Sequence, residues 1–204
     1  MTIDAAQKAG GFSKNEGKTA LAMPDPLDLL VSYFQGEALE TIILHGRAVA
    51  GLAVDIGRSL ALDGDELAFL DQAGLLHDIG VCRVHAPKIG LNGKHPYIMH
   101  GVIGRDVLES EGMPRHALVS ERHIGVGLNQ EDIINQQLPL PLRDMIPTTL
   151  SEEIICFADL FYSKTPGKLE QRKSPQHVRE KLAKFGEHKV QIFDGWLLRF
   201  GGVL

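Results

Sequence analysis

The chain has 204 residues, of which 44% are hydrophobic and 23% are charged, and its formal net charge is −5. This composition is typical of one globular domain and excludes a disordered chain. The acidic balance also argues against a surface that neutralises phosphates, so we expect no nucleic-acid partner and interpret the basic run from Lys164 to Lys184 as a solvated helix face.

Cysteine content and hydropathy indicate the compartment. Cys82 and Cys156 are the only two cysteines, which predicts reduced thiols in a cytoplasm rather than a disulfide framework. Met1 to Ala20 contain no continuous apolar stretch of the signal-peptide type, and no run of about 18 apolar residues occurs anywhere. We therefore expect a soluble cytoplasmic protein without a membrane partner.

The first predicted helix follows an expected tail. Residues 1–24 are rich in Gly, Lys, Ala, Ser and Asn, which predicts a flexible N-terminal tail before one domain over residues 25–204. From Glu37 onwards the apolar residues repeat at three and four positions, which predicts a helix with His45 on its apolar face. Beside that face runs a stripe of small residues that lets another helix approach closely: Gly46, Ala50, Ala53 and Gly57.

Two further helices are predicted in the middle of the chain. Asp63, with Glu66 three residues later, is typical of an N-cap, and this helix should reach His77 before Gly80 ends it. His95-Pro96 predicts the start of the next helix, which Gly112 should close.

The remaining helices complete an all-α prediction. Pro114 should begin a short helix that reaches His123, and Thr149 with Glu152 should form a capping box. Ser174-Pro175 predicts a helix that ends near Gly186. The last helix is amphipathic and either covers the core of its own domain or pairs with another copy in a homo-oligomer. No alternating strand pair with hairpin turn chemistry is evident, so we expect an all-α domain.

His77 and Asp78 carry the strongest chemical signal, because they lie side by side at the end of an apolar helix. An ionised carboxylate among such neighbours costs several kcal/mol (order of magnitude) unless a cation or strong donors lie nearby. His45 and Asp159 also occupy apolar helical faces, where an aliphatic residue would be expected. A lone histidine on such a face is usually a satisfied core residue, but the four together predict a divalent metal site.

The order His45, His77-Asp78, Asp159 resembles the H…HD…D signature of the HD-domain superfamily of metal-dependent phosphohydrolases. Leu75 to Gly80 also match the HDIG form of its central motif, and the resemblance covers residues 39–164. It implies an HD-type helical bundle that binds a divalent metal. Imidazole and carboxylate ligands together do not select one metal, so Mn, Fe, Co, Ni, Mg and Zn all stay open.

Two more histidines extend the resemblance. His100 and His123 fall between the HD pair and the last Asp, as extra histidines do in the binuclear branches, which include the HD-GYP phosphodiesterases. That similarity implies a second metal, with Asp78 bridging; the alternative is a proton donor or phosphate contact over a single metal. The chain departs from the HD-GYP pattern at Val81 and after His123, where no second His and no Gly-Tyr-Pro occur, so cyclic di-GMP is not the expected substrate.

The resulting prediction is an enzyme. It is a metal-dependent phosphohydrolase that acts on a small phosphomonoester, nucleotide or cyclic phosphodiester through a metal-activated water. Asp78, His100 and His123 are the catalytic candidates, and Lys88, Arg122 and Lys164 are candidate phosphate donors. The Pro-rich residues 138–147 are a candidate wall or lid. Two alternatives stay open: a non-catalytic HD-like signalling or protein-binding module, and a di-iron HD-type oxygenase.

Overall fold

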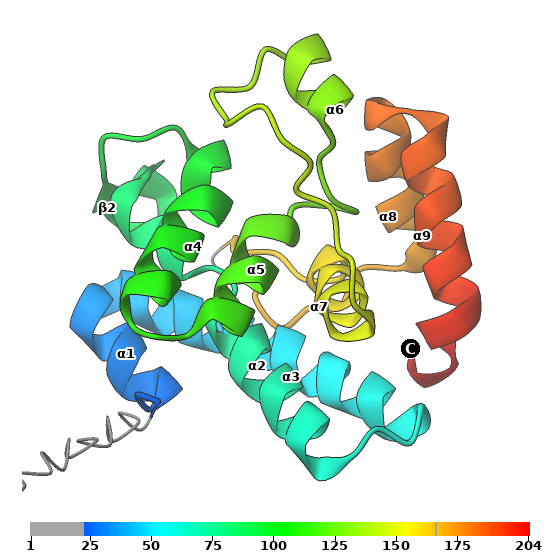
Figure 1. The fold of residues 1–204 in the computed structure, drawn as a ribbon, viewed down its shortest axis with the longest axis horizontal. Coiled ribbons are helices and arrows are strands. Elements are labelled where there is room, and N and C mark those ends of the chain that lie inside the picture. The colour runs from blue at the N-terminus through cyan, green and yellow to red at the C-terminus, as the bar shows by residue number, and fades with distance from the viewer. Residues whose placement is uncertain (1–22, 166) are drawn as a thin grey trace, which may run out of the picture.

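The computed structural model describes residues 23–165 and 167–204 (Figure 1). The expected N-terminal tail therefore lies outside the described residues, except for its last two positions. The first described helix, α1 (Pro26–Tyr33), was not predicted from the sequence; Asp25 caps it by accepting from the amides of Leu27 and Asp28.

The described part of the chain is helical, which confirms the all-α prediction. Figure 1 shows α7 in the middle of the molecule, with α4 and α5 on one side of it and the α8–α9 pair on the other. The α-helices after α1 are α2 (Gly36–Ser59), α3 (Gly64–Leu76), α4 (His100–Ser110), α5 (Pro114–Arg122), α6 (Gln130–Asn135), α7 (Leu150–Leu160), α8 (Pro175–Leu182) and α9 (Glu187–Phe200).

Short elements connect the α-helices. One antiparallel hairpin pairs β1 (His85–Ala86) with β2 (Leu91–Asn92), and its strands are too short to show an alternating pattern in the sequence. The 3-10 helices are η1 (Ile79–Arg83), η2 (Pro87–Ile89), η3 (Tyr97–Met99), η4 (Ala183–Phe185) and η5 (Gly201–Val203). Within the described ranges, no helix is long and apolar enough to cross a membrane.

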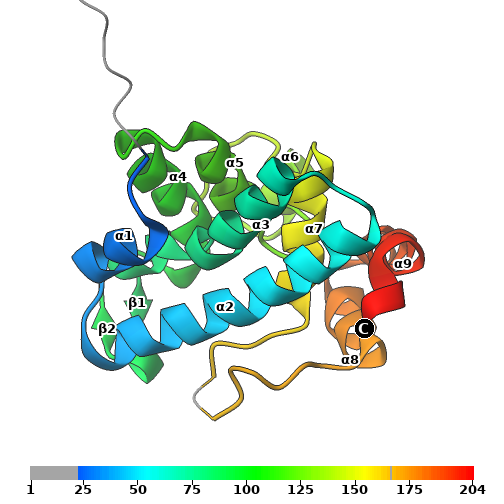
Figure 2. The same ribbon diagram turned by 90° about the horizontal axis from the view of Figure 1, so that it is seen from below.

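The small-residue stripe of α2 does receive another helix, as predicted. Figure 2 shows α3 lying against α2. A Cβ added at Gly74 of α3 would lie 2.6 Å from the Cα of Ala50, and one added at Gly46 would lie 2.8 Å from the carbonyl oxygen of Leu75. This close contact fixes His45 of α2 relative to the end of α3, where His77 lies.

Three details of the predicted elements were wrong. Gly80 does not end α3; it lies inside η1, where its missing side chain lets η1 approach α4. Pro96 does not open an α-helix, because its ψ of 146° is extended and a 3-10 turn precedes α4 at His100. Thr149 caps α7, but Glu152 accepts from the amide of Thr148, so the reciprocal half of the capping box is missing.

Two hydrophobic clusters form the core. One joins α3, α7, α8 and α9 around Phe157 and Phe193, and the other joins α1, η1 and α4 around Leu30 and Ile79. The apolar face of α9 packs on the first cluster, so this helix covers the core of its own chain. The long helix α2 contributes to both clusters, with Ile42 in one and Val49 in the other, and His45 lies between them.

The contact between η1 and α4 gives a stability prediction. A Cβ at Gly80 would lie 2.0 Å from the carbonyl oxygen of His100 and 2.3 Å from the amide nitrogen of Gly104. We expect Gly80→Ala to lower the free energy of unfolding by about 3 kcal/mol, because backbone atoms cannot move aside as a side chain can. Urea unfolding measures the change.

The matched control is Gly51→Ala on the exposed side of α2, where no atom lies within 4 Å of the added Cβ. This variant should be more stable than the parent by about 0.5–1 kcal/mol, because alanine loses less backbone entropy in a helix than glycine. A Gly80→Ala protein of unchanged stability would contradict the close approach of η1 and α4.

Candidate metal centre

The four residues of the predicted signature converge at the boundary of the two hydrophobic clusters. His45 comes from α2, His77 and Asp78 from the junction of α3 and η1, and Asp159 from the last turn of α7. Nε2 of His45 lies 3.3 Å from Asp78 Oδ2 and 3.0 Å from Asp159 Oδ1. Nε2 of His77 lies 3.0 Å and 3.5 Å from the same two oxygens.

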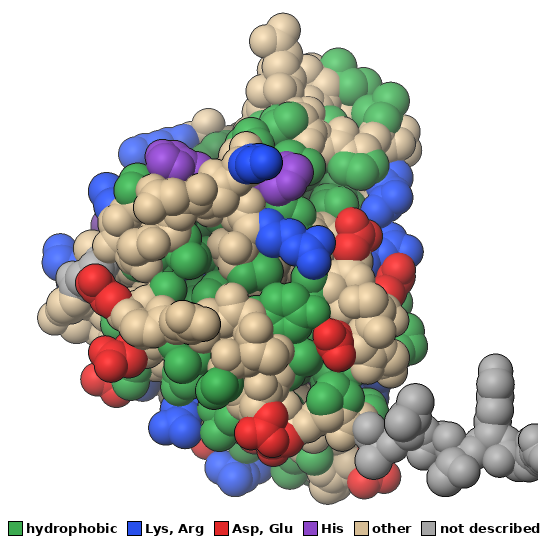
Figure 3. Space-filling view, turned by 90° about the vertical axis from the view of Figure 1, so that its left-hand side faces the viewer, with side chains coloured by type: hydrophobic (Ala, Val, Ile, Leu, Met, Phe, Trp, Pro, Cys, Tyr) green, Lys and Arg blue, Asp and Glu red, His purple; other side chains and the backbone are tan. Residues whose placement is uncertain are grey.

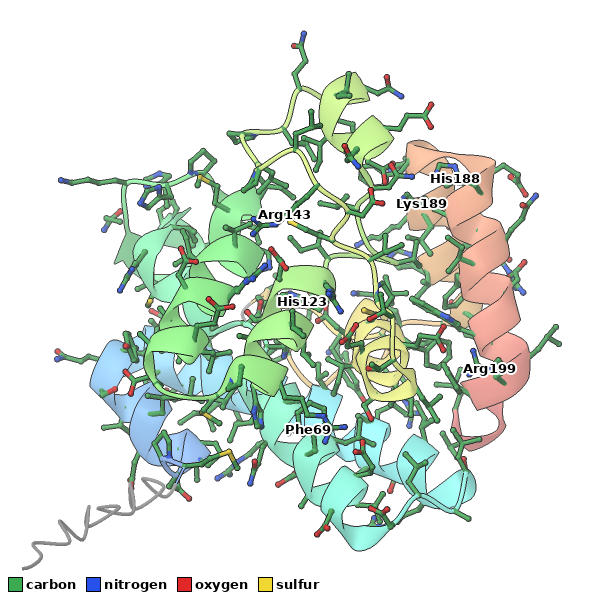
Figure 4. All side chains as sticks on the ribbon, in the orientation of Figure 1. Phe69, His123, Arg143, His188, Lys189 and Arg199 are labelled. Atoms are coloured by element: carbon green, nitrogen blue, oxygen red, sulfur yellow. The ribbon has the colours of Figure 1, made fainter. Side chains whose placement is uncertain are left out.

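The other carboxylate oxygen of Asp78 faces the two additional histidines. His100 begins α4, His123 follows the end of α5, and the Nε2 of each lies 3.5 Å from Asp78 Oδ1. Figure 4 shows His123 at the end of α5 that faces α7. Oδ2 of Asp78 therefore faces one group of donors and Oδ1 faces another, which is the arrangement that a bridging carboxylate requires.

Backbone carbonyls orient three of the four imidazoles. Nδ1 of His77, His100 and His123 lies 2.7 Å from the carbonyl oxygens of Gly74, Tyr97 and Ser120, respectively. A carbonyl oxygen can only accept, so each Nδ1 carries a proton and Nε2 is the ring nitrogen left to bind a cation. This is the tautomer that a metal-binding histidine with a carbonyl partner adopts.

The buried polar atoms at the centre are not satisfied by the protein. Among the described residues, Nδ1 and Nε2 of His45 and Nε2 of His77 are buried without a hydrogen-bond partner, and the carboxylate oxygens of Asp78 have only the close contacts with Lys164 and the imidazoles. The Nε2 atoms of His100 and His123 lie 3.1 Å apart. Buried groups in this state are costly, and a cation among them would remove the cost.

The spacing of the donor atoms fits a divalent cation. Two ligands at about 2.1 Å from one metal lie about 3.0–3.4 Å apart in octahedral or tetrahedral geometry, close to the separations observed here. Three groups have donor atoms within 4.8 Å of one another: His45, His77 and Asp78; His77, His123 and Asp159; and Asp78, His100 and His123. The donor set therefore fits one or two divalent cations, and it does not identify the metal.

The electrostatics of the centre also favour a cation. Burial opposes the charged forms of Asp78 and Asp159, but their cationic neighbours outweigh it and hold the pKa of both carboxyls well below the usual range. Burial alone would lower the pKa of His77, yet the two carboxylates raise it to about 10. His100 differs, because burial lowers its pKa to about 3 and keeps its ring neutral.

Lys164 is the predicted phosphate donor that the structure brings to the centre. Its Nζ lies 2.7 Å from Asp78 Oδ2, and its side chain is mostly buried. Burial opposes its charge, but Asp78 and Asp159 raise its pKa above the ordinary value, so the ammonium stays protonated. Lys164 and Asp159 both line a cavity of about 670 Å³.

Arg122 is not at the centre. Its Nη1 donates to Thr148 Oγ1 at 2.8 Å and forms an ion pair with the buried Glu152, at 3.0 Å. Successive residues of a helix point about 100° apart, so a guanidinium next to His123 in the sequence faces a different direction. Arg122 instead joins the end of α5 to the first turn of α7. Lys88, by contrast, lines the cavity from η2.

Several residues at the site were missed by the sequence analysis. Tyr97 lines the cavity, and its ring lies 4.8 Å from that of His100. The buried Ser120 donates to the carbonyl oxygen of His77 at 2.7 Å, and its own carbonyl orients His123. Lys173 donates its Nζ to the carbonyls of Leu160 and Tyr162 at the end of α7. These roles depend on tertiary contacts that no local motif shows.

The Pro-rich residues 138–147 contribute one wall residue. Leu138 lines the cavity, whereas Arg143 pairs with the buried Glu121 of α5, with 2.5 Å between Nη2 and Oε1 (Figure 4). Arg105 of α4 reaches the same carboxylate, with 2.8 Å between Nη1 and Oε2. The two arginines therefore hold this stretch against the helices that position His100 and His123.

Comparison with known proteins agrees with this centre. Residues 42–163 match the HD domain, and the chain belongs to the HD domain family. No solved structure gives a significant match to the chain.

Three relatives are similar to parts of the chain. An uncharacterized protein of Methanocaldococcus jannaschii is 36% identical over 59% of this chain and 65% of its own length. A tRNA (cytidine(56)-2'-O)-methyltransferase of Thermoplasma volcanium is 31% identical over 87% of this chain, and one of Picrophilus torridus is 29% identical over 71%. The chain spans only 50% and 38% of the length of these two methyltransferases.

The raised pKa of His77 predicts how metal affinity depends on pH. Below its pKa of about 10, His77 is protonated in the cation-free protein, and a cation must displace that proton. The apparent dissociation constant of the metal should therefore fall roughly tenfold for each unit by which the pH rises between pH 6 and 8, because His77 releases about one proton when the metal binds. Titration calorimetry in buffers of different ionisation enthalpy measures the release. A binding constant independent of pH over this range would contradict the assignment of His77 as a ligand.

Proposed function

We propose that the protein is a metal-dependent phosphohydrolase that acts on a small phosphomonoester, nucleotide or cyclic phosphodiester. The observation that supports it best is the buried Asp78 carboxylate, whose two oxygens face two separate groups of imidazole donors. Membership of the HD domain family supports the same class of activity.

The cavity beside the centre contains groups that could bind a phosphorylated substrate. Its lining contains five lysines, Lys88, Lys164, Lys173, Lys181 and Lys189, and Asp159 is the one acidic residue among the described lining residues. Lysine ammonium groups in a partly enclosed site attract and hold phosphate oxygens. The remaining wall is largely apolar, which suits the non-phosphate part of a substrate.

Each proposed role follows from position and charge. A bound divalent cation would supply a water of lowered pKa and would polarise a phosphoryl oxygen. Lys164 lies between Asp78 and the cavity, where its ammonium can stabilise negative charge that develops on the phosphoryl group. Burial of its hydroxyl group raises the pKa of Tyr97 to about 12, although the residue as a whole is partly exposed, so its Oη keeps a proton that can be donated to a substrate oxygen.

The methyltransferase relatives do not change this proposal. By their names they modify tRNA, yet this chain spans half or less of their length. We infer that methyl transfer belongs to the part of those proteins that this chain does not cover, because the part shared with the Thermoplasma volcanium protein covers 87% of this chain and so overlaps the HD domain match at residues 42–163. Their names do support an RNA as a substrate or partner worth testing.

The first test joins metal analysis to turnover. The purified protein should contain a divalent metal and hydrolyse at least one compound in a screen of phosphomonoesters, nucleotides and cyclic nucleotides with added manganese, iron, cobalt or nickel. Asp78→Ala should lose the metal and reduce kcat/KM by about a thousandfold or more, because both donor groups share this carboxylate. The matched control is Asp106→Ala, on the exposed side of α4.

The outcomes separate the alternatives. A protein that binds no divalent metal and hydrolyses none of these compounds would support a non-catalytic module. Oxygen consumption with a di-iron spectrum would support an oxygenase. Undiminished hydrolysis by Asp78→Ala would show that the reaction takes place at a different centre.

A second test counts the metals. His123 belongs to the donor group around Asp78 Oδ1, whereas His45 belongs to the group around Oδ2. If two ions bind, His123→Gln should retain about one of them and His45→Gln should lose the other, as measured by elemental analysis of the purified variants. Equal metal content in the parent and in His123→Gln would favour a single metal, with His123 acting on protons or phosphate.

A further inference from the structure

We propose that the site accepts the end of a single-stranded nucleic acid, which lies over a basic and aromatic rim around the cavity. This inference rests on the proposed function for its chemistry and extends it from small phosphate compounds to a strand. It also departs from the expectation, drawn from the net charge, that the chain has no nucleic-acid partner.

The charge of the chain is unevenly distributed. Residues 79–104 contain three Lys or Arg residues and no Asp or Glu, and residues 160–184 contain seven Lys or Arg and two Asp or Glu. The net charges of these two segments are +3 and +5. Because the whole chain carries −5, the remaining residues carry −13.

The structure brings the two basic segments to one place. The first contains η1, the β1–β2 hairpin and η3; the second contains the segment after α7 and helix α8. Both line the same cavity, Lys88 from the first segment and Lys164 and Lys181 from the second. Figure 3 shows Lys, Arg and His side chains close together on the upper part of the face that carries the hairpin. Within the run from Lys164 to Lys184, the cavity is lined by Lys164, Lys173 and Lys181, whereas other basic residues are exposed outside it, as the sequence predicted: Lys168, Arg172 and Lys184.

Two lysines of the rim are available to a ligand. Lys88 and Lys181 are exposed, and neither forms an ion pair or a side-chain hydrogen bond with any residue in the described ranges. The other lining lysines have partners: Lys164 pairs with Asp78, Lys189 pairs with Asp132, and Lys173 binds backbone carbonyls. Free ammonium groups from η2 and from α8, which both line the cavity, fit an anion that extends beyond it.

Exposed aromatic side chains accompany these lysines. Tyr97 is 40% exposed and Phe185 is 57% exposed, and both line the cavity. Packing in the chain's own core does not explain such exposure. A positive groove combined with aromatic side chains on which bases stack is the usual means of binding single-stranded nucleic acids. A cavity of about 670 Å³ can enclose the end of a strand, and the next phosphates then meet the rim.

Fluorescence anisotropy with a labelled 12-nucleotide single strand tests the proposal at several salt concentrations. The RNA strand should bind at low salt more tightly than a duplex of the same sequence, because only unpaired bases can stack on Phe185 and Tyr97. Lys88→Gln/Lys181→Gln should weaken binding about tenfold or more and reduce the salt slope by about 1 to 2, because two phosphate contacts are lost. Phe185→Ala should weaken binding roughly tenfold without changing the slope.

The matched control is Arg58→Gln/Arg199→Gln, which removes the same charge from two exposed positions that do not line the cavity. This control should bind as the parent does. Equal binding by the lysine variant and the control, or duplex binding as tight as single-strand binding, would overturn the proposal. The same measurement with a DNA strand of the same sequence shows whether the site prefers RNA. Tighter binding of RNA would identify RNA as the ligand, and equal binding would show that either kind of single strand is accepted; both results support the proposal.

Hydrolysis of p-nitrophenyl phosphate, measured on the same preparations, separates this inference from the proposed function. A protein that hydrolyses the small ester but binds no strand would overturn this inference and leave the phosphohydrolase in place. A protein that binds the strand through the rim lysines but hydrolyses no phosphoester would support the nucleic-acid site at the rim and contradict the proposed hydrolysis.

Discussion

The buried carboxylate of Asp78 is the group on which the site depends. Its side chain is almost fully inaccessible, and its charge is balanced by Lys164 and by protonated His77. Imidazoles from three further elements lie within 3.5 Å of it. A carboxylate in such surroundings destabilises the fold unless positive charge surrounds it. The same requirement that makes this residue costly to bury favours a cation beside it, so the stability of the centre and any affinity for a cation are linked.

The helical fold meets this requirement by bringing the ends of helices together. Asp78 follows α3, His100 begins α4, His123 follows α5, and Asp159 is in the last turn of α7. Glycines 74 and 80 allow the backbone contacts that set the distances between these ends. Buried polar contacts then fix their orientation: Ser120 joins α5 to the carbonyl of His77, and Arg122 joins α5 to α7. The contacts of Ser120 and Arg122 therefore contribute to the geometry of the site together with the candidate metal-binding residues.

The sequence predicted the parts of this arrangement that leave a local signal. His45 and Asp159 interrupt apolar helical faces, and the glycine and alanine stripe of α2 indicated a close helix contact; the structure brings these features together as expected. The sequence could not show contacts between residues that lie far apart in the chain. Arg122 is directed away by Glu152, thirty residues later in the chain, and Lys173 binds carbonyls at the end of α7. The roles of the converging residues as metal ligands stay predictions.

The net charge of the chain does not describe the charge around the cavity, for a physical reason. Charges more than about 8–10 Å apart are largely screened at physiological ionic strength, so an approaching anion responds to the nearby charges and not to the total. The two segments around the cavity carry +8 together, while the rest of the chain carries −13. Low-dielectric walls concentrate the positive potential at the opening, and the acidic remainder repels anions from other surfaces. This distribution supports the proposal that phosphate-bearing ligands enter the cavity beside Asp159.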